Sequence, residues 1–179
     1  MDFLYSTYRL FSAGLFASLY PPFWLYSRLS GRYGRDLSQR LGCYPRKLLK
    51  HVTGSPRIWI HAVSVGEVTV AAAIVRELEG LLPQGSILAS STTEHGRACA
   101  RAELPARIPC VYAPVDFSAA ARRALTTVKP HILVFVETEI WPNWLMEAAR
   151  QGIRTAFVNG RISVRSIKGY AKLRPLMRT

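Results

Sequence analysis

Two short segments of the sequence place carboxylates directly after an apolar run. Ser64-Val65-Gly66-Glu67 follows the run 58–63, and Glu137-Thr138-Glu139 follows the run 132–136. A carboxylate held at such a position can accept the proton of a hydroxyl group, which is the task of a general base in a group-transfer reaction. One glutamate would be enough to place favourable charge at a helix N-terminus, so two glutamates favour a chemical role for one of them.

Ser64 and Glu67 also have a purely structural interpretation. Their spacing is that of a capping box, in which the serine caps a helix and the glutamate bonds back to the backbone N–H of the cap. Ser91-Thr92-Thr93-Glu94 has the same spacing. Gly66 favours a binding role instead, because glycine in a first helical turn costs up to about 1 kcal/mol relative to alanine. Its presence indicates close approach of another group to the backbone, and a helix N-terminus suits an anionic one.

Asn159-Gly160-Arg161 follows a third apolar run, 155–158. A turn with an N-cap explains this tripeptide, but Asn159 and Arg161 could also hold a phosphate or a sugar hydroxyl. His61 lies inside an apolar run, where a lone histidine is more often structural than catalytic, and we interpret it so.

The apolar runs alternate with helical patterns, which predicts the elements that position these residues. We expect helices over 71–80, 93–102, 118–127, 141–150 and 163–173, and strands over 58–63, 86–90, 108–112, 132–136 and 155–158. Five strand–helix alternations predict an α/β fold, a doubly wound and mostly parallel Rossmann-like sheet. The expected strand order 3-2-1-4-5 puts the first and fourth strands side by side, so Glu67 and Glu137 should share one crevice at their carboxyl ends.

Charge and hydropathy divide the chain into three parts. Basic residues total 24 against 11 acidic ones and gather at both ends. Residues 1–30 hold an apolar, aromatic stretch over 11–26 that is followed by arginines, and a membrane anchor, an in-plane interfacial helix or a helix packed on its own domain would each fit. Residues 31–56 are predicted as a basic juxtamembrane segment, and residues 57–179 as the Rossmann-like domain. The positive-inside rule places everything after the first stretch in the cytoplasm.

Several function classes find little support in the sequence. There is no dinucleotide or nucleoside-triphosphate phosphate loop, no nucleophile elbow and no metal-ligand cluster. The three cysteines, an odd number with no C-x-x-C spacing, fit a reduced cytoplasmic setting. The net charge of +13 permits nucleic-acid binding, but no recognition motif or aromatic platform accompanies it, so we expect no nucleic-acid partner.

Four segments together resemble the 3-deoxy-D-manno-octulosonic acid (Kdo) transferases. These segments are HAVSVGE at 61–67, VYAPVDF at 111–117, KPHILVFVETEIWPN at 129–143 and VNGRISVRSIKGYAKL at 158–173. The resemblance covers nearly the whole chain, including the N-terminal apolar stretch and the basic segment behind it. It implies lipopolysaccharide biosynthesis at the cytoplasmic face of the inner membrane. There the enzymes transfer Kdo from CMP-Kdo to the lipid A precursor, lipid IVA.

The resemblance also implies an architecture and residue roles. The chain would be the acceptor-binding half of an inverting, metal-independent glycosyltransferase with two Rossmann domains (GT-B). Glu67 would be the proton acceptor and Glu137 the transition-state stabiliser, and Ser64, Gly66, Asn159 and Arg161 would bind the acceptor. The expected partners are the lipid A precursor and acidic inner-membrane lipids. No cofactor is implied, because CMP-Kdo is a substrate.

The family continues past the position where this sequence stops, Thr179, into the domain that binds CMP-Kdo. We therefore expect the 179-residue chain to be inactive alone and to require a separately encoded donor domain. A different class remains as the alternative: a non-catalytic membrane-surface module that binds acidic lipid through its basic ends.

Overall fold

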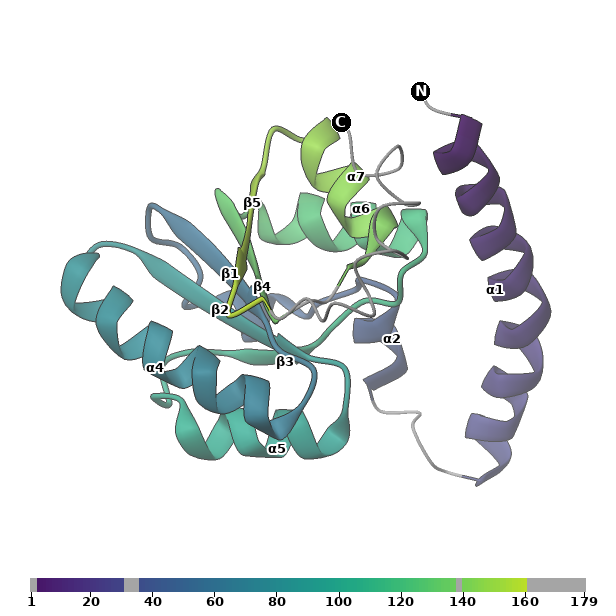
Figure 1. The fold of residues 1–179 in the computed structure, drawn as a ribbon. Helices are drawn as coiled ribbons and strands as arrows, with labels where there is room; N and C mark the ends of the chain where they lie inside the picture. The colour runs from purple at the N-terminus through teal and green to yellow at the C-terminus, as the bar shows by residue number, and fades with distance from the viewer. Residues whose placement is uncertain (1–2, 31–35, 138–139, 161–179) are drawn as a thin grey trace.

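The chain forms a five-stranded parallel sheet with helices on both faces and one long helix beside it (Figure 1). The computed structural model describes residues 3–30, 36–137 and 140–160. The strands are β1 (Arg57–His61), β2 (Ser86–Ser91), β3 (Cys110–Tyr112), β4 (Ile132–Val136) and β5 (Arg154–Val158). The helices are α1 (Phe3–Ser30), α2 (Leu37–Arg40), α3 (Arg46–Leu49), α4 (Val65–Leu81), α5 (Glu94–Glu103), α6 (Ser118–Val128) and α7 (Pro142–Arg150).

The strand order is β3-β2-β1-β4-β5, which confirms the predicted order. All four strand pairings are parallel, so the carboxyl ends of the strands meet at one edge of the sheet. In the register of β1 and β4, Ile60 is opposite Val134 and His61 is opposite Phe135. The segments that carry Glu67 and Glu137 therefore leave the sheet from neighbouring strands at the same edge.

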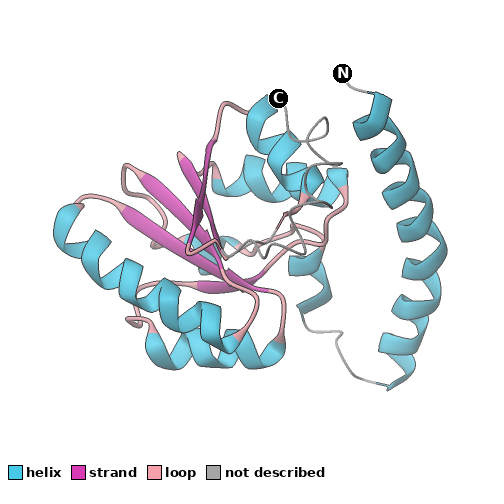
Figure 2. Ribbon diagram, in the orientation of Figure 1, coloured by secondary structure: helices cyan, strands magenta, loops and turns pink. Residues whose placement is uncertain are grey.

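Two hydrophobic cores explain why these strands are nearly continuous apolar runs. β1 to β4 are mostly buried on both faces, as strands covered by crossover helices are, while the edge strand β5 is partly exposed. On one face Ile58, Ile60 and Val134 pack against α4 and α5. On the other face Trp59, Phe135 and residues of α6 and α7 form the second core. The two helix pairs lie on opposite sides of the magenta sheet in Figure 2.

The main corrections to the predicted elements concern short segments. β1 ends at His61, two residues before the predicted end, because Glu67 rather than a neighbouring strand bonds the N–H of Val63. β3 begins at Cys110, since Ile108 is bonded into a turn by the carbonyl of Pro105. The short helices α2 and α3 were not predicted. The predicted helix 163–173 lies outside the described residues.

α1 is a single helix of 28 residues that runs through Pro21 and Pro22. Its first half contacts the body of the protein: the hydroxyl of Tyr5 bonds Asn143, that of Tyr8 bonds Asp116, and Phe16 stacks on Phe117. Among the residues that the structure describes, no helix combines the length and the hydropathy that a bilayer crossing needs.

Candidate functional site

The loop between β1 and α4 is fixed on both sides by hydrogen bonds. The hydroxyls of Ser91 and Thr93, from the neighbouring strand β2 and the start of α5, both donate to the carbonyl of Val63, at 3.1 and 3.0 Å. Gly96 permits this approach, because a Cβ there would lie 2.6 Å from the same carbonyl oxygen. The loop that leads into Glu67 is thus held in place by tertiary contacts.

Ser64 and Glu67 form a complete capping box at the start of α4. The hydroxyl of Ser64 accepts from the N–H of Glu67, and the carboxylate of Glu67 accepts from the N–H of Ser64, each at 3.3 Å. The structural interpretation of this motif is therefore confirmed. The second S-x-x-E segment behaves differently, because Thr93 rather than Ser91 is the N-cap of α5.

Glu67 makes more contacts than a capping box needs. Its Oε2 accepts from the N–H of Val63 at 2.7 Å, and its Oε1 also accepts from the hydroxyl of Ser64 at 2.8 Å. The side chain is 5% exposed. Ser64 is exposed, so a substrate hydroxyl that displaced its hydroxyl would meet Oε1 of Glu67, at the cost of the cap bond from the N–H of Glu67.

The space in front of this helix start is open. Ser64, Val65 and Gly66 are exposed, and a Cβ added to Gly66 would meet nothing within 4 Å. Among the residues that the structure describes, no neighbouring group explains the glycine, and a binding role for Gly66 stays a prediction.

Glu137 and Asn159 both adopt left-handed backbone conformations directly after neighbouring strands. Their φ angles are 62° and 55°. The N–H of Glu137 donates to the carbonyl of Val158 at 2.8 Å, which ties the end of β4 to the end of β5. Asparagine tolerates this region, but glutamate is strained in it by roughly 1–2 kcal/mol. Strain of this kind is common at functional sites.

The predicted site residues are thus gathered at one edge as far as the structure describes them. Each of three neighbouring strands is followed by one of these segments. Ser64 to Glu67 follow β1, Glu137 follows β4, and Asn159 follows β5. Thr138, Glu139 and Arg161 lie outside the described residues. The catalytic and binding roles of all these residues stay predictions.

His61 is a buried strand residue, as predicted. Its Nδ1 lies 3.0 Å from the hydroxyl of Ser90, which also accepts from the indole of Trp59. Its ring packs against Trp144 and Phe135. Burial lowers the pKa of His61 to about 4, so the imidazole is uncharged at neutral pH and is poorly suited to proton transfer there.

Two carboxylates that contact α7, the half-buried Asp116 and the buried Glu147, were not identified from the sequence. Asp116 caps α7 from outside the helix, because its Oδ1 accepts from the N–H groups of Asn143 and Trp144. Desolvation raises the pKa of Asp116 to about 6. Its place in the VYAPVDF segment, as a carboxylate that follows an apolar run, was the available signal.

Glu147 is the second of these carboxylates. It accepts from Ser118 at 2.7 Å and pairs with Arg122 and Arg150. Burial alone would raise the pKa of Glu147, but the hydrogen bonds from Arg122 and Ser118 lower it overall. Both carboxylates serve to hold α7, which follows the Glu137 segment. Within the described ranges, no group of three potential metal ligands is found.

Comparisons with known proteins agree with this arrangement. The family model described as 3-deoxy-D-manno-octulosonic-acid transferase (kdotransferase) matches residues 35–179. The transferase of that name from Haemophilus influenzae is 32% identical over 155 residues, which cover 87% of this chain and 36% of that protein. The one from Chlamydia pneumoniae is 32% identical over 148 residues, 82% of this chain and 33% of that protein.

A relative that bears a different name also matches. A bifunctional glycosyltransferase/methyltransferase from Fusobacterium nucleatum is 37% identical over 124 residues, which cover 68% of this chain and 19% of that protein. This chain therefore spans about a third or less of the length of these relatives. No solved structure matches the chain significantly.

Proposed function

The chain belongs to the 3-deoxy-D-manno-octulosonic acid transferase family, and we propose that it supplies the acceptor-binding half of a two-domain (GT-B) Kdo transferase. The transferred sugar would come from CMP-Kdo and the acceptor would be the lipid A precursor. In this proposal the carboxyl edge of the sheet, with Glu67 and Glu137, meets the acceptor. The donor nucleotide would bind on a second domain that faces this edge.

One observation supports the proposal: Glu67 is a rigidly held carboxylate whose Oε1 bonds the hydroxyl of an exposed residue, Ser64, at a helix start. The backbone N–H groups of Val63 and Ser64 fix the carboxylate. Gly66, in the same helix start, is also exposed. A general base needs a fixed position within hydrogen-bond reach of the substrate hydroxyl, which here would approach from the side of Ser64.

The proposed chemistry is a direct displacement. A hydroxyl of the acceptor sugar gives its proton to Glu67 while its oxygen attacks the anomeric carbon of Kdo. The bond between that carbon and the phosphate oxygen of CMP breaks, and CMP leaves with the electron pair. Attack from the face opposite the leaving group inverts the anomeric carbon, and no metal ion takes part. Glu137 would stabilise the positive charge that develops on the sugar in the transition state.

Acceptor binding would use groups at the same edge. The N-terminus of α4 would meet a phosphate or hydroxyl through the side chain of Ser64 and the backbone N–H of Gly66. Asn159 and Arg161 would contact the headgroup from the segment after β5. The basic residues of 31–56 would face acidic lipids at the cytoplasmic surface of the inner membrane.

The test is a chimera in which this chain replaces the corresponding part of the Haemophilus influenzae relative. Transfer of radiolabelled Kdo from CMP-Kdo to the lipid A precursor is measured for the chimera and for its Glu67→Gln variant. Because a positioned general base contributes about 10²–10⁴-fold, Glu67→Gln should lower transfer by at least 100-fold and leave acceptor binding in place.

A matched control separates catalysis from loss of stability. Glu67→Gln loses one acceptor oxygen, that for the N–H of Val63, which should cost about 1 kcal/mol of stability. Tyr44→Phe removes the buried hydrogen bond to the carbonyl of Tyr112 at a similar cost of about 1 kcal/mol, and it touches none of the predicted site residues. Tyr44→Phe should retain transfer. Equal activities of the two variants would refute the role of Glu67, and an unaltered Glu67→Gln chimera would favour a non-catalytic lipid-binding module.

A further inference from the structure

A deep apolar groove lies between α1 and the body of the protein. Its volume is about 560 Å³, which is within the usual range of small-molecule sites. We call it the α1 groove. Its apolar walls are formed by Phe11, Leu15 and Leu19 on the helix and by Leu41, Val115 and Phe117 on the body.

The α1 groove is long enough for an extended hydrocarbon chain. It runs along α1 from Tyr8 to Phe23, which corresponds to about 22 Å at about 1.5 Å of rise per residue. The hydrocarbon of one membrane leaflet is about 15 Å thick, half of a core of about 30 Å. A complete acyl chain therefore fits along the groove.

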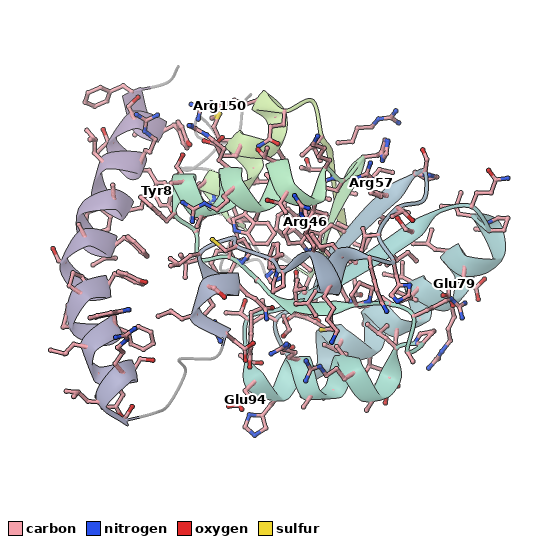
Figure 3. The ribbon with its side chains drawn as sticks, turned by 180° about the vertical axis from the view of Figure 1, so that it is seen from behind. Tyr8, Arg46, Arg57, Glu79, Glu94 and Arg150 are labelled. Atoms are coloured by element: carbon pink, nitrogen blue, oxygen red, sulfur yellow. The ribbon has the colours of Figure 1, made fainter. Side chains whose placement is uncertain are left out.

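Specific contacts hold α1 in the position that forms the groove. The hydroxyl of Tyr8 donates to Oδ2 of Asp116 at 2.5 Å, and Asn143 donates to the hydroxyl of Ser12 at 3.3 Å. The rings of Phe16 and Phe117 stack with centroids 4.6 Å apart. Figure 3 shows Tyr8 extending from α1 toward the body. These contacts fix the spacing of the helix from the body without filling the groove.

One wall of the α1 groove lies at the same edge of the sheet as the candidate site, because Val115 to Phe117 follow the carboxyl end of β3. Asp116, which lines the groove, also caps α7 through the N–H of Asn143. The helix α7 in turn begins a few residues after Glu137. A molecule whose headgroup lies at this edge can place its tail in the groove.

Charge indicates what kind of amphiphile would lie there. Of the residues that the structure describes, two charged ones line the α1 groove. The carboxylate of Asp116 is already bonded by Tyr8, Asn143 and Trp144. The guanidinium of Arg40 lies 4.4 Å from the centre of the Tyr112 ring and places a cation beside the apolar walls. A cation at the wall of an apolar groove suits a ligand that has both a hydrocarbon chain and an anionic headgroup.

We propose that the α1 groove binds an acyl chain of the glycolipid acceptor and so selects acylated acceptors over deacylated ones. This inference rests on the proposed function. α1 is then part of the acceptor site, and its groove-facing side has a role separate from that of its outward-facing side.

The experiment compares binding of two radiolabelled probes to the full 179-residue chain: the lipid A precursor, and the same headgroup with its acyl chains removed. The groove variant is Leu15→Gln with Leu19→Gln, and its matched control is Leu10→Gln with Leu29→Gln. All four leucines lie on α1 and are 49, 58, 72 and 79% exposed in that order, but only the first two line the groove. Glutamine has nearly the helix propensity of leucine, so both variants keep the helix.

The inference predicts that the chain binds the acylated probe at least tenfold more tightly than the deacylated one. The groove variant should lose this difference, and the control variant should keep it. Equal weakening by both variants would overturn the inference, since general hydrophobicity of α1 would then explain binding. The inference would also be overturned if the wild-type chain is a dimer, the groove variant is a monomer, and both bind the acylated probe with the same preference. The groove would then be assigned to contact with a second copy of the chain.

Failure of the proposed function gives a different result. If the wild-type chain binds neither probe, the proposed acceptor-binding role is wrong, and the groove inference, which rests on it, is wrong as well. If it binds both probes equally, the headgroup site stands and only the groove inference is wrong.

Discussion

The left-handed backbone of Glu137 leads to a prediction in which stability and activity change in opposite directions. At a φ of 62°, a non-glycine residue costs roughly 1–2 kcal/mol. Glycine removes this strain but loses roughly 0.5–1 kcal/mol more conformational entropy on folding. The Glu137→Gly variant should therefore be more stable by about 0.5–1 kcal/mol. For a chain of this size, about 1 kcal/mol corresponds to a rise in Tm of roughly 2–4 °C.

Urea unfolding of the chain measures this stability directly, and Kdo transfer by the chimera measures activity. Glu137→Gly should lower transfer about 100-fold, as expected for loss of a group that stabilises transition-state charge. Asn159→Gly is the matched control for the backbone, because asparagine already tolerates its φ of 55° and little strain is released. If Glu137→Gly is less stable than the wild type, or keeps full transfer, the link between strain and function is wrong.

Three further predictions concern groups around the same edge. Gly66→Ala should raise the free energy of unfolding by up to about 1 kcal/mol, since its Cβ meets nothing within 4 Å, and should weaken acceptor binding in a titration. Glu147→Gln should lower the free energy of unfolding by about 2 kcal/mol, less than for a fully buried ion pair because the side chain of Arg122 is 59% exposed. As the pKa of Glu147 is lowered in the fold, its contribution is present above the pKa of the unfolded chain and is lost as pH falls. The pKa of Asp116 is raised to about 6 in the folded state, so between about pH 4 and 6 the folded chain holds a proton that the unfolded chain has lost. Its contribution to the free energy of unfolding should therefore fall as pH rises through this range. Asp116→Asn should remove that slope from a plot of Tm against pH, and an unchanged slope would contradict the assignment.

The sequence predicted the sheet well because its signals are local. The apolar run at β4, the helix pattern of α4 and the proline at the start of α7 are each encoded within a few residues, and parallel crossovers limit the possible strand orders. The carboxyl edge and its candidate residues followed from that order.

The contacts that depend on remote residues were not predicted. Tyr8 meets Asp116 across 108 positions, and Tyr5 meets Asn143 across 138, so no window of sequence contains both partners. The strain at Glu137 was also invisible, because its left-handed conformation is imposed by the bond to Val158 on β5. The capping box, a structural alternative already visible in the sequence, is confirmed, and the catalytic role of Glu67 stays a prediction.

The central claim is that the carboxyl edge of the sheet receives the acceptor, and amide NMR tests it most directly. The headgroup of the lipid A precursor, without acyl chains, is titrated into the 15N-labelled chain. The account predicts shifts at the amides of Gly66 and Asn159 and none at Gly85, which precedes β2 at the opposite edge. Shifts at Gly85 with none at Gly66 and Asn159 would contradict it.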